Sequence, residues 1–413
     1  MVETKQTEER VILVAVRQSD DDDNTDRSLD ELEELASTAG AVTVTRIIQN
    51  REAIHPGTYV GKGKIEEIRD AIYMYDATGI ICDDELSPAQ MANLEEALEV
   101  KIMDRTLVIL DIFAARANTG EGKIQVELAQ LKYRATRLVG LRSSLSRLGG
   151  GIGTRGPGET KLEMDRRLIH QRIAQLKREL ADVVTHRELT RNQRKRAGVP
   201  VIAIVGYTNA GKSTLLNTLT GADVLEEDKL FATLDPTTRS LTLESGQEVL
   251  LTDTVGFISK LPHQLVDAFK STLEEAVYAD MLIHVVDASN PDMDAQMYTV
   301  YDTLDKLGAS DKPVITAFNK TDRIIEGIHA KDLRAEHTVR ISAKHGDGLD
   351  KLKAVIEEVL RENKVYIERV FDYSEAGKIS LIRKYGELLS EEYTAEGIAV
   401  KAYAPVEVAD KIR

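Results

Sequence analysis

The stretch VIAIVGYTNAGKS, residues 201–213, sets the fold class of the second half of this chain. Its five leading apolar residues predict a buried strand, and the pattern G-x-x-x-x-G-K-S from Gly206 to Ser213 follows directly. A helix is expected from Lys212 to Leu219. This order of strand, glycine-rich turn and helix aims backbone N–H groups and a helix N-terminus at one point. We therefore predict a polyphosphate-binding loop, with Lys212 reaching the β- and γ-phosphates and the Ser213 hydroxyl binding Mg²⁺.

Two later segments supply what such a loop needs to bind Mg²⁺ and to respond to hydrolysis. A strand expected over residues 249–252 ends in Asp253-Thr254-Val255-Gly256, so Asp253 can hold the metal through water and the Gly256 amide can meet the γ-phosphate. The segment FATLDPTTR, residues 231–239, offers a threonine hydroxyl as a second metal ligand. We choose Thr233 over Thr237 and Thr238 because Thr233 comes before the Leu-Asp-Pro turn.

The base of the nucleotide is predicted by two short motifs that each follow an apolar strand. In Asn319-Lys320-Thr321-Asp322, the Asp322 carboxylate can accept hydrogen bonds from guanine N1–H and the exocyclic amine, a donor pair that adenine lacks, while the Lys320 stem covers the base. In Ile341-Ser342-Ala343-Lys344, the Ala343 amide suits guanine O6. GTP is therefore expected, with an ATP-using enzyme as the alternative.

The predicted site is large, and its members share a place in one of these motifs. The expected GTP contacts are Gly206, Tyr207, Thr208, Asn209, Ala210, Gly211, Lys212, Ser213, Thr214, Phe231, Ala232, Thr233, Leu234, Asp235, Asp253, Thr254, Val255, Gly256, Asn319, Lys320, Thr321, Asp322, Ser342, Ala343 and Lys344. Among them Lys212, Thr233 and Gly256 are the expected catalytic residues, and Ser213, Thr233 and Asp253 the expected magnesium ligands.

Phe257 stands where small signalling GTPases carry the glutamine that orients the attacking water. A phenyl ring has no hydrogen-bonding group for this task. We therefore expect slow hydrolysis by the protein alone and stimulation by a partner.

Composition indicates a soluble protein in a reducing compartment. Hydrophobic residues make up 42% of the 413 residues and charged residues 30%, and no apolar run approaches the roughly 18–20 residues that span a bilayer. The N-terminus has no apolar segment typical of a secretion signal. The single cysteine, Cys82, is expected to be a small buried hydrophobe in a cytoplasmic protein.

The charge is segregated along the chain. The whole chain carries a formal net charge of −15, but residues 132–200 hold 17 Lys and Arg against 6 Asp and Glu, a net charge of +11. Apolar residues spaced by three and four predict two long helices that fold back on each other around a glycine-rich tip at residues 149–160. The candidate RNA contacts near this tip are Arg142, Arg147, Arg155, Lys161, Arg166 and Arg167. An ordinary loop flanked by solvated arginines is the alternative.

The remaining segments complete an α/β organisation. Residues 1–117 have the β-α-β rhythm of a small α/β domain, in which Gly61 to Lys64 form either a second anion site or a tight turn with exposed lysines. Residues 118–195 form the helical hairpin and 196–363 the GTPase domain. Residues 364–413 predict a strand, a helix over 376–389 and a strand, either as a separate small module or as an extension of the GTPase sheet.

These motifs together resemble the translation-factor-related class of P-loop GTPases. The segment GGIGTRGPGET, residues 150–160, with FATLDP at 231–236 and DTVGFI at 253–258, is similar to the HflX family over nearly the whole chain. That family commonly has glutamine at the position of Lys161. The resemblance implies a cytoplasmic, Mg²⁺-dependent GTPase that binds the large ribosomal subunit and its rRNA through the N-terminal region and hairpin, and splits stalled or idle ribosomes under stress. A monomer with no DNA partner and no membrane span is expected. The alternative is a GTP-dependent switch that controls a non-ribosomal protein or membrane partner.

Overall fold

The computed structural model describes residues 8–18, 22–148, 157–197, 199–221, 230–260, 262, 273–324, 331–362 and 364–412. The chain divides into two compact units, which are Met1–Asp182 with Ser259–Phe269, and Val183–Ile258 with Lys270–Arg413. The α/β class predicted from the sequence is confirmed, because parallel sheets with helical connections occur in both units. The finer boundaries expected after residues 117, 195 and 363 stay predictions. Within the described ranges, no helix is long and apolar enough to cross a membrane.

The first unit contains a four-stranded parallel sheet with the order β2-β1-β3-β4. Its strands are β1 (Glu9–Arg17), β2 (Ala41–Asn50), β3 (Gly79–Cys82) and β4 (Lys101–Asp104). The helices of this domain are α1 (Asp22–Thr38), α2 (Lys62–Tyr75), α3 (Pro88–Leu98) and α4 (Arg105–Arg116). Strand β4 was not predicted, because it is only four residues long and is defined by its pairing with β3, which lies earlier in the chain. Cys82 is buried in this core, as expected.

The possible anion site at residues 61–64 is occupied by contacts within the protein. Gly61 is the N-cap of α2, and its amide donates to Gln49 Oε1 at 2.8 Å. Lys64 pairs with Glu67, one helical turn further on, at 2.6 Å. These contacts favour the reading of this segment as a turn and helix start.

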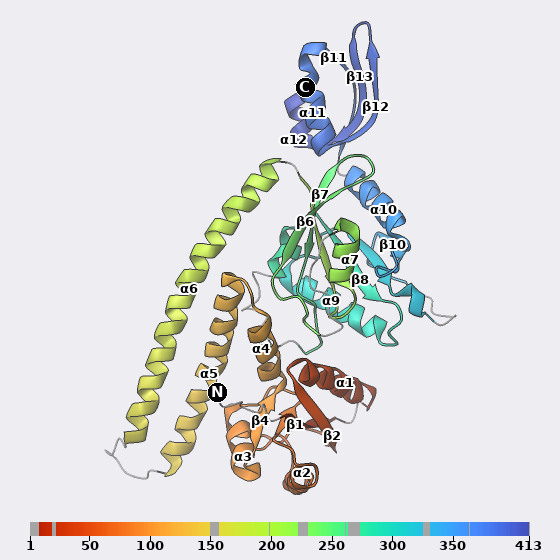
Figure 1. The fold of residues 1–413 in the computed structure, drawn as a ribbon. Helices are drawn as coiled ribbons and strands as arrows, with labels where there is room; N and C mark the ends of the chain where they lie inside the picture. The colour runs from red at the N-terminus through yellow and green to blue at the C-terminus, as the bar shows by residue number, and fades with distance from the viewer. Residues whose placement is uncertain are drawn as a thin grey trace, which may run out of the picture. The chain divides into compact units, whose positions relative to one another are not determined.

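Two long helices, α5 (Gly120–Leu148) and α6 (Pro157–Ala197), follow the first sheet. Figure 1 shows them running in opposite directions from the residues between them. Within the first unit, Arg172 on α6 donates to both carboxylate oxygens of Glu127 on α5, at 2.7 and 2.8 Å. Leu128 and Leu176 of the predicted apolar seam are buried. The glycine-rich residues 149–156 lie outside the described ranges.

The second unit is built on a six-stranded sheet with the order β10-β9-β8-β5-β7-β6. Its strands are β5 (Val201–Gly206), β6 (Thr237–Thr242), β7 (Glu248–Asp253), β8 (Met281–Asp287), β9 (Val314–Asn319) and β10 (His337–Arg340). All neighbours are parallel except β6, which pairs antiparallel to β7. The helices α7 (Lys212–Thr220), α9 (Met293–Leu307) and α10 (Leu349–Glu362) accompany this sheet (Figure 1). Apolar side chains of the strands, α7 and α10 form one buried core.

The C-terminal segment forms its own antiparallel sheet, with the order β11-β13-β12. It comprises β11 (Val365–Phe371), α11 (Ala376–Tyr385), β12 (Glu387–Thr394), β13 (Gly397–Ala404) and α12 (Val406–Ile412). This sheet does not extend the six-stranded one, which answers the alternative left open by the sequence. The helix expected over 376–389 is wrong at its end. It stops at Tyr385, because the backbone of Gly386 is extended (φ −117°, ψ −167°) and Glu387 begins β12.

Candidate nucleotide site

The candidate site lies where several parallel strands of the six-stranded sheet end. The phosphate-loop pattern follows β5, Asp253 ends β7 and Asn319 ends β9. Loops that leave the carboxyl ends of parallel strands at one edge of a sheet converge there, and this is where α/β proteins usually bind ligands. Motifs widely separated in the sequence are thus brought to one place.

The two glycines of the loop are required by backbone conformation and by close approach. Gly206 has φ 152° and Gly211 has φ 97°, values that L side chains rarely adopt. A Cβ on Gly206 would meet Val285 O at 2.3 Å, and one on Gly211 would meet Asn319 Nδ2 at 2.3 Å. The loop can therefore pass close to β8 and β9 only with glycine at both positions.

Lys212 is held inside this loop. Its side chain is buried, and Nζ donates to Tyr207 O at 2.7 Å. Burial lowers the pKa of Lys212 to about 8, with the Asp253 carboxylate opposing this change. Because this hydrogen bond goes to a neutral carbonyl oxygen, the buried ammonium would be stabilised further by an anion, as expected for a lysine that binds phosphate.

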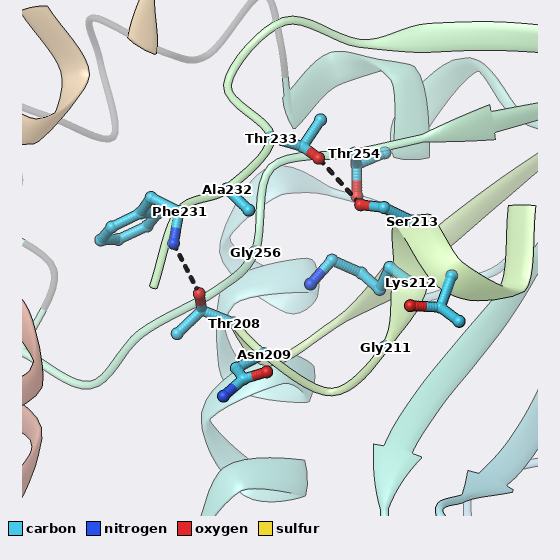
Figure 2. A pocket seen from close by; sticks show the side chains of 11 residues that line it. Thr208, Asn209, Gly211, Lys212, Ser213, Phe231, Ala232, Thr233, Thr254 and Gly256 are labelled. Atoms are coloured by element: carbon cyan, nitrogen blue, oxygen red, sulfur yellow. Dashed lines mark hydrogen bonds between the residues drawn. The ribbon is translucent and has the colours of Figure 1, made fainter. Parts of the chain in front are cut away.

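A pocket opens directly in front of the loop (Figure 2). Every residue that lines it belongs to the set predicted from the sequence. The lining residues are Thr208, Asn209, Gly211, Lys212, Ser213, Thr214, Phe231, Ala232, Thr233, Thr254 and Gly256. The Thr208 hydroxyl accepts a hydrogen bond from Phe231 N at 2.9 Å, which ties the segment after residue 230 to the phosphate loop.

Three oxygen-bearing side chains meet at one side of this pocket. Ser213 Oγ lies 2.8 Å from Thr233 Oγ1 (Figure 2). The same Ser213 hydroxyl donates to Asp253 Oδ2 at 2.7 Å. Asp253 is fully buried, and its Oδ1 has no hydrogen-bond partner among the described residues. Burial raises the pKa of Asp253. Hard oxygen donors with an unpartnered buried carboxylate oxygen fit Mg²⁺, which neutral hydroxyls alone would not attract. Thr238, a rejected candidate, instead bonds Thr252 at 3.0 Å.

The motifs assigned to the base are connected by hydrogen bonds from their side chains. Asn319 Nδ2 donates to Ala210 O at 2.9 Å, and Asn319 Oδ1 accepts from Ala343 N at 2.9 Å. The amide that the sequence assigned to guanine O6 is therefore directed to Asn319 here. Asp322 Oδ1 accepts from Ser342 Oγ at 2.6 Å, and this bond lowers the pKa of Asp322. Asp322 is thus an ionised acceptor at neutral pH, as recognition of guanine requires.

Other predicted residues do not line this pocket. Tyr207, Ala210, Leu234 and Val255 are buried, and Lys344 is exposed. Of the candidate RNA contacts, Arg166 and Arg167 on α6 have described side chains, and Arg167 is exposed. The side chains of Arg142, Arg147, Arg155 and Lys161 lie outside the described part of the chain.

One acidic residue of this region escaped the sequence analysis. Asp287, the last residue of β8, forms an ion pair with Lys320 at 2.8 Å. The sequence could have indicated Asp287, because it is a carboxylate directly after the apolar run 281–286. A parallel strand formed by this run ends at the same edge of the sheet as the phosphate loop.

Comparison with known proteins decides the family. A chain 68% identical over 408 residues, covering 99% of this protein and 96% of its own length, is GTPase HflX of Lacrimispora saccharolytica. This chain belongs to the HflX family. A second HflX GTPase, from Caldanaerobacter subterraneus subsp. tengcongensis, is 51% identical over all of this chain and 95% of its own. The resemblance found in the motifs is therefore confirmed, and the protein is a GTPase.

Three family models match successive parts of the chain. A model described as GTP-binding GTPase N-terminal matches residues 26–114, and one described as GTP-binding GTPase middle region matches 116–194. A model described as 50S ribosome-binding GTPase matches residues 201–320. Among solved structures, a GTP-binding protein from the archaeon Sulfolobus solfataricus in complex with GDP is 24% identical, with 85% of this chain and 99% of that chain covered and a TM-score of 0.44.

Proposed function

We propose that this HflX-family GTPase binds the large ribosomal subunit in its GTP state and splits stalled or idle ribosomes under stress. The observation that carries the proposal is the match of residues 201–320 to the model described as a 50S ribosome-binding GTPase. The basic hairpin supports it, since residues 132–200 carry a net charge of +11 on an otherwise acidic chain. Concentrated positive charge is the usual means of meeting the RNA phosphate backbone. A cytoplasmic location follows from this partner.

In the proposed reaction water attacks the γ-phosphate of GTP, and the chain supplies position and charge. Lys212 balances the charge that develops on the phosphate oxygens, and the Gly256 amide donates to the γ-phosphate. Ser213, Thr233 and Asp253 are the residues that would hold Mg²⁺, which when bound neutralises charge on the β- and γ-phosphate oxygens. Asn319, Lys320 and Asp322 would bind the guanine base. The Phe257 side chain cannot orient the water, so we expect hydrolysis to be slow in the protein alone and to be stimulated by the ribosome.

Sedimentation with purified large ribosomal subunits tests the proposal. The full chain is mixed with subunits in a GTP analogue and in GDP, each at two salt concentrations. We expect cosedimentation that is stronger with the GTP analogue and that falls steeply with salt, because Lys and Arg contacts to phosphate release counterions.

A pair of matched variants on α6 adds a site-specific readout. Arg167→Gln removes an exposed charge near the basic tip, whereas Arg172→Gln removes a charge that is already paired with Glu127. Arg167→Gln should weaken binding and reduce the slope of log affinity against log salt by about one, with Arg172→Gln changing it less. If binding to the subunit depends neither on the bound nucleotide nor on the salt concentration, the result would instead favour a switch that acts on a non-ribosomal partner.

A further inference from the structure

Asp287 and Lys320 are neighbours across two strands of the sheet. The register of β8 and β9 places Asp287 opposite Asn319, the residue before Lys320. The strand ends are joined here by Ala288 N, which donates to Asn319 O at 3.0 Å. Lys320 Nζ lies 2.8 Å from Asp287 Oδ2, and the side chains are only 17% and 14% exposed. This ion pair is therefore more shielded from water than a surface pair, whose contribution is usually small.

The ammonium of Lys320 has a second partner in the phosphate loop. Nζ donates to Asn209 O at 2.9 Å, so the same group links the loop to β8. Lys320 and Asn209 both have φ 60°, in the left-handed region that non-glycine residues rarely adopt. With its head fixed at both contacts, the aliphatic stem of Lys320 has little freedom where it has to cover the guanine ring.

Asp287 is itself fixed, which makes it able to orient another side chain. Its Oδ1 accepts hydrogen bonds from Ser289 N at 3.0 Å and Ser289 Oγ at 2.6 Å. One carboxylate oxygen is thus held by the turn after β8, and the other faces Lys320. The Asp287 carboxylate also offsets the positive charge of Lys320. This matters because Lys320 lies close to Lys212, whose ammonium has to remain available for phosphate.

We propose that Asp287 is a positioning residue for guanine nucleotides, which acts by holding the Lys320 ammonium so that the lysine stem lies against the base. It is not a catalytic residue, because it acts through Lys320 and not on the phosphates. The inference rests on the GTPase site and is independent of any ribosomal partner.

A double-mutant cycle tests this role in the full chain. The variants are Asp287→Asn, Lys320→Met and the double variant, with the dissociation constant and release rate of a fluorescent GDP as readouts. Each single variant should weaken GDP binding about tenfold, the size of effect expected for a charge-assisted hydrogen bond. The double variant should be no weaker than Lys320→Met to within about twofold, because both changes break the same contact. The loss in kcat at saturating GTP should be smaller than the loss in affinity.

Two additional variants separate this role from a general loss of structure. Asp302→Asn breaks an exposed aspartate–lysine pair with Lys306 on α9, in the same unit, and should leave GDP affinity and melting temperature unchanged. Ser289→Ala keeps the carboxylate but removes one of its anchors, and should weaken GDP binding by about threefold. It also provides the readout if Asp287→Asn folds poorly.

The contradicting results are equally specific. If the effects of Asp287→Asn and Lys320→Met multiply in the double variant, Asp287 does not act through Lys320. Inorganic pyrophosphate, which has no base, provides a further check through competition with fluorescent GDP. If Asp287→Asn weakens pyrophosphate as much as GDP, the residue serves the phosphate loop and the proposal is wrong.

Discussion

Phe257 illustrates what one residue contributes to this site. Its N–H donates to Gly206 O at 3.1 Å, and its carbonyl accepts from Thr208 N at 2.8 Å. The ring is 1% exposed. The sequence showed that this position lacks a water-orienting glutamine, and the structure adds that the ring is part of the core. The backbone of Phe257 ties the segment after Gly256 to the start of the phosphate loop, at Gly206 and Thr208, while its buried ring packs in the core.

Substitutions of Phe257 should therefore be separated by volume. Phe257→Ala should lower the free energy of unfolding by about 3–5 kcal/mol, because it leaves a cavity in a packed site. Phe257→Leu keeps most of the apolar volume and should cost less than about 1.5 kcal/mol. Denaturant unfolding and GTP turnover, normalised to folded protein, are the measurements. We expect Phe257→Leu to keep turnover within a few-fold. Loss of turnover by this variant at unchanged stability would show that the ring acts in catalysis.

The segment that follows β7 passes close to the phosphate loop at Gly256. A Cβ at this position would lie 2.7 Å from Thr208 Cα and 2.9 Å from Lys212 Nζ. Real Cβ atoms do not approach backbone this closely, so the segment would have to move away from the loop. The conformation is otherwise ordinary, since Gly256 does not have a positive φ. The requirement for glycine is therefore one of space.

Gly256→Ala should weaken the GTP state more than the GDP state. The displaced amide could no longer reach a γ-phosphate, whereas GDP has none to lose. Loss of one hydrogen bond to a charged group predicts a reduction in affinity for a non-hydrolysable GTP analogue of about tenfold or more. Fluorescent GDP and GTP-analogue titrations measure the ratio. Gly377→Ala on α11, where the added methyl group meets open space and φ is not positive, is the control for added volume alone. An equal loss for both nucleotides would contradict a role in sensing the γ-phosphate.

At the scale of the elements, prediction from the sequence was best where the signal was continuous. The strands β5, β7 and β9 were expected because each is an apolar run directly before a recognisable motif. Strand β6 was missed, since residues 237–242 are mostly polar and form an edge strand against β7. The first three residues of β12 were read as the end of a helix, and the rest of the strand was not predicted, because its hydrogen bonds go to β13, which follows it in the chain. Such pairing is difficult to predict from the residues of the strand alone.

At the scale of the whole molecule, the two compact units have separate apolar cores. One core is formed by side chains of the first sheet and of the helices beside it. The other is formed by side chains of the six-stranded sheet, α7 and α10. The nucleotide pocket belongs to the second unit. The only cysteine, Cys82, is buried in the first, where burial raises the pKa of its thiol. A buried thiol reacts only when the surrounding structure opens, so it reports on the first unit.

GDP should accordingly stabilise one unit in preference to the other. At a free concentration of 100 times its dissociation constant, GDP should add about 2.7 kcal/mol to the second unit. Hydrogen exchange of peptides from β5 and α7 should slow, while the rate of Cys82 labelling in moderate denaturant stays the same. Lys212→Met, which removes the phosphate-binding charge, should abolish the effect of GDP. Equal protection of Cys82 by GDP would mean that the two units unfold as one.

The sequence by itself determined the chemistry of this protein. The phosphate loop, Thr233, Asp253 and the guanine motifs are contiguous signals, because the backbone turns and side chains that bind a nucleotide lie within a few residues of each other. Tertiary structure alone decided which of these groups meet. It placed Ser213 and Thr233 beside Asp253, separated the C-terminal sheet from the larger one, and brought Asp287 to Lys320. These outcomes depend on strand order and register, which arise from packing between segments far apart in the chain.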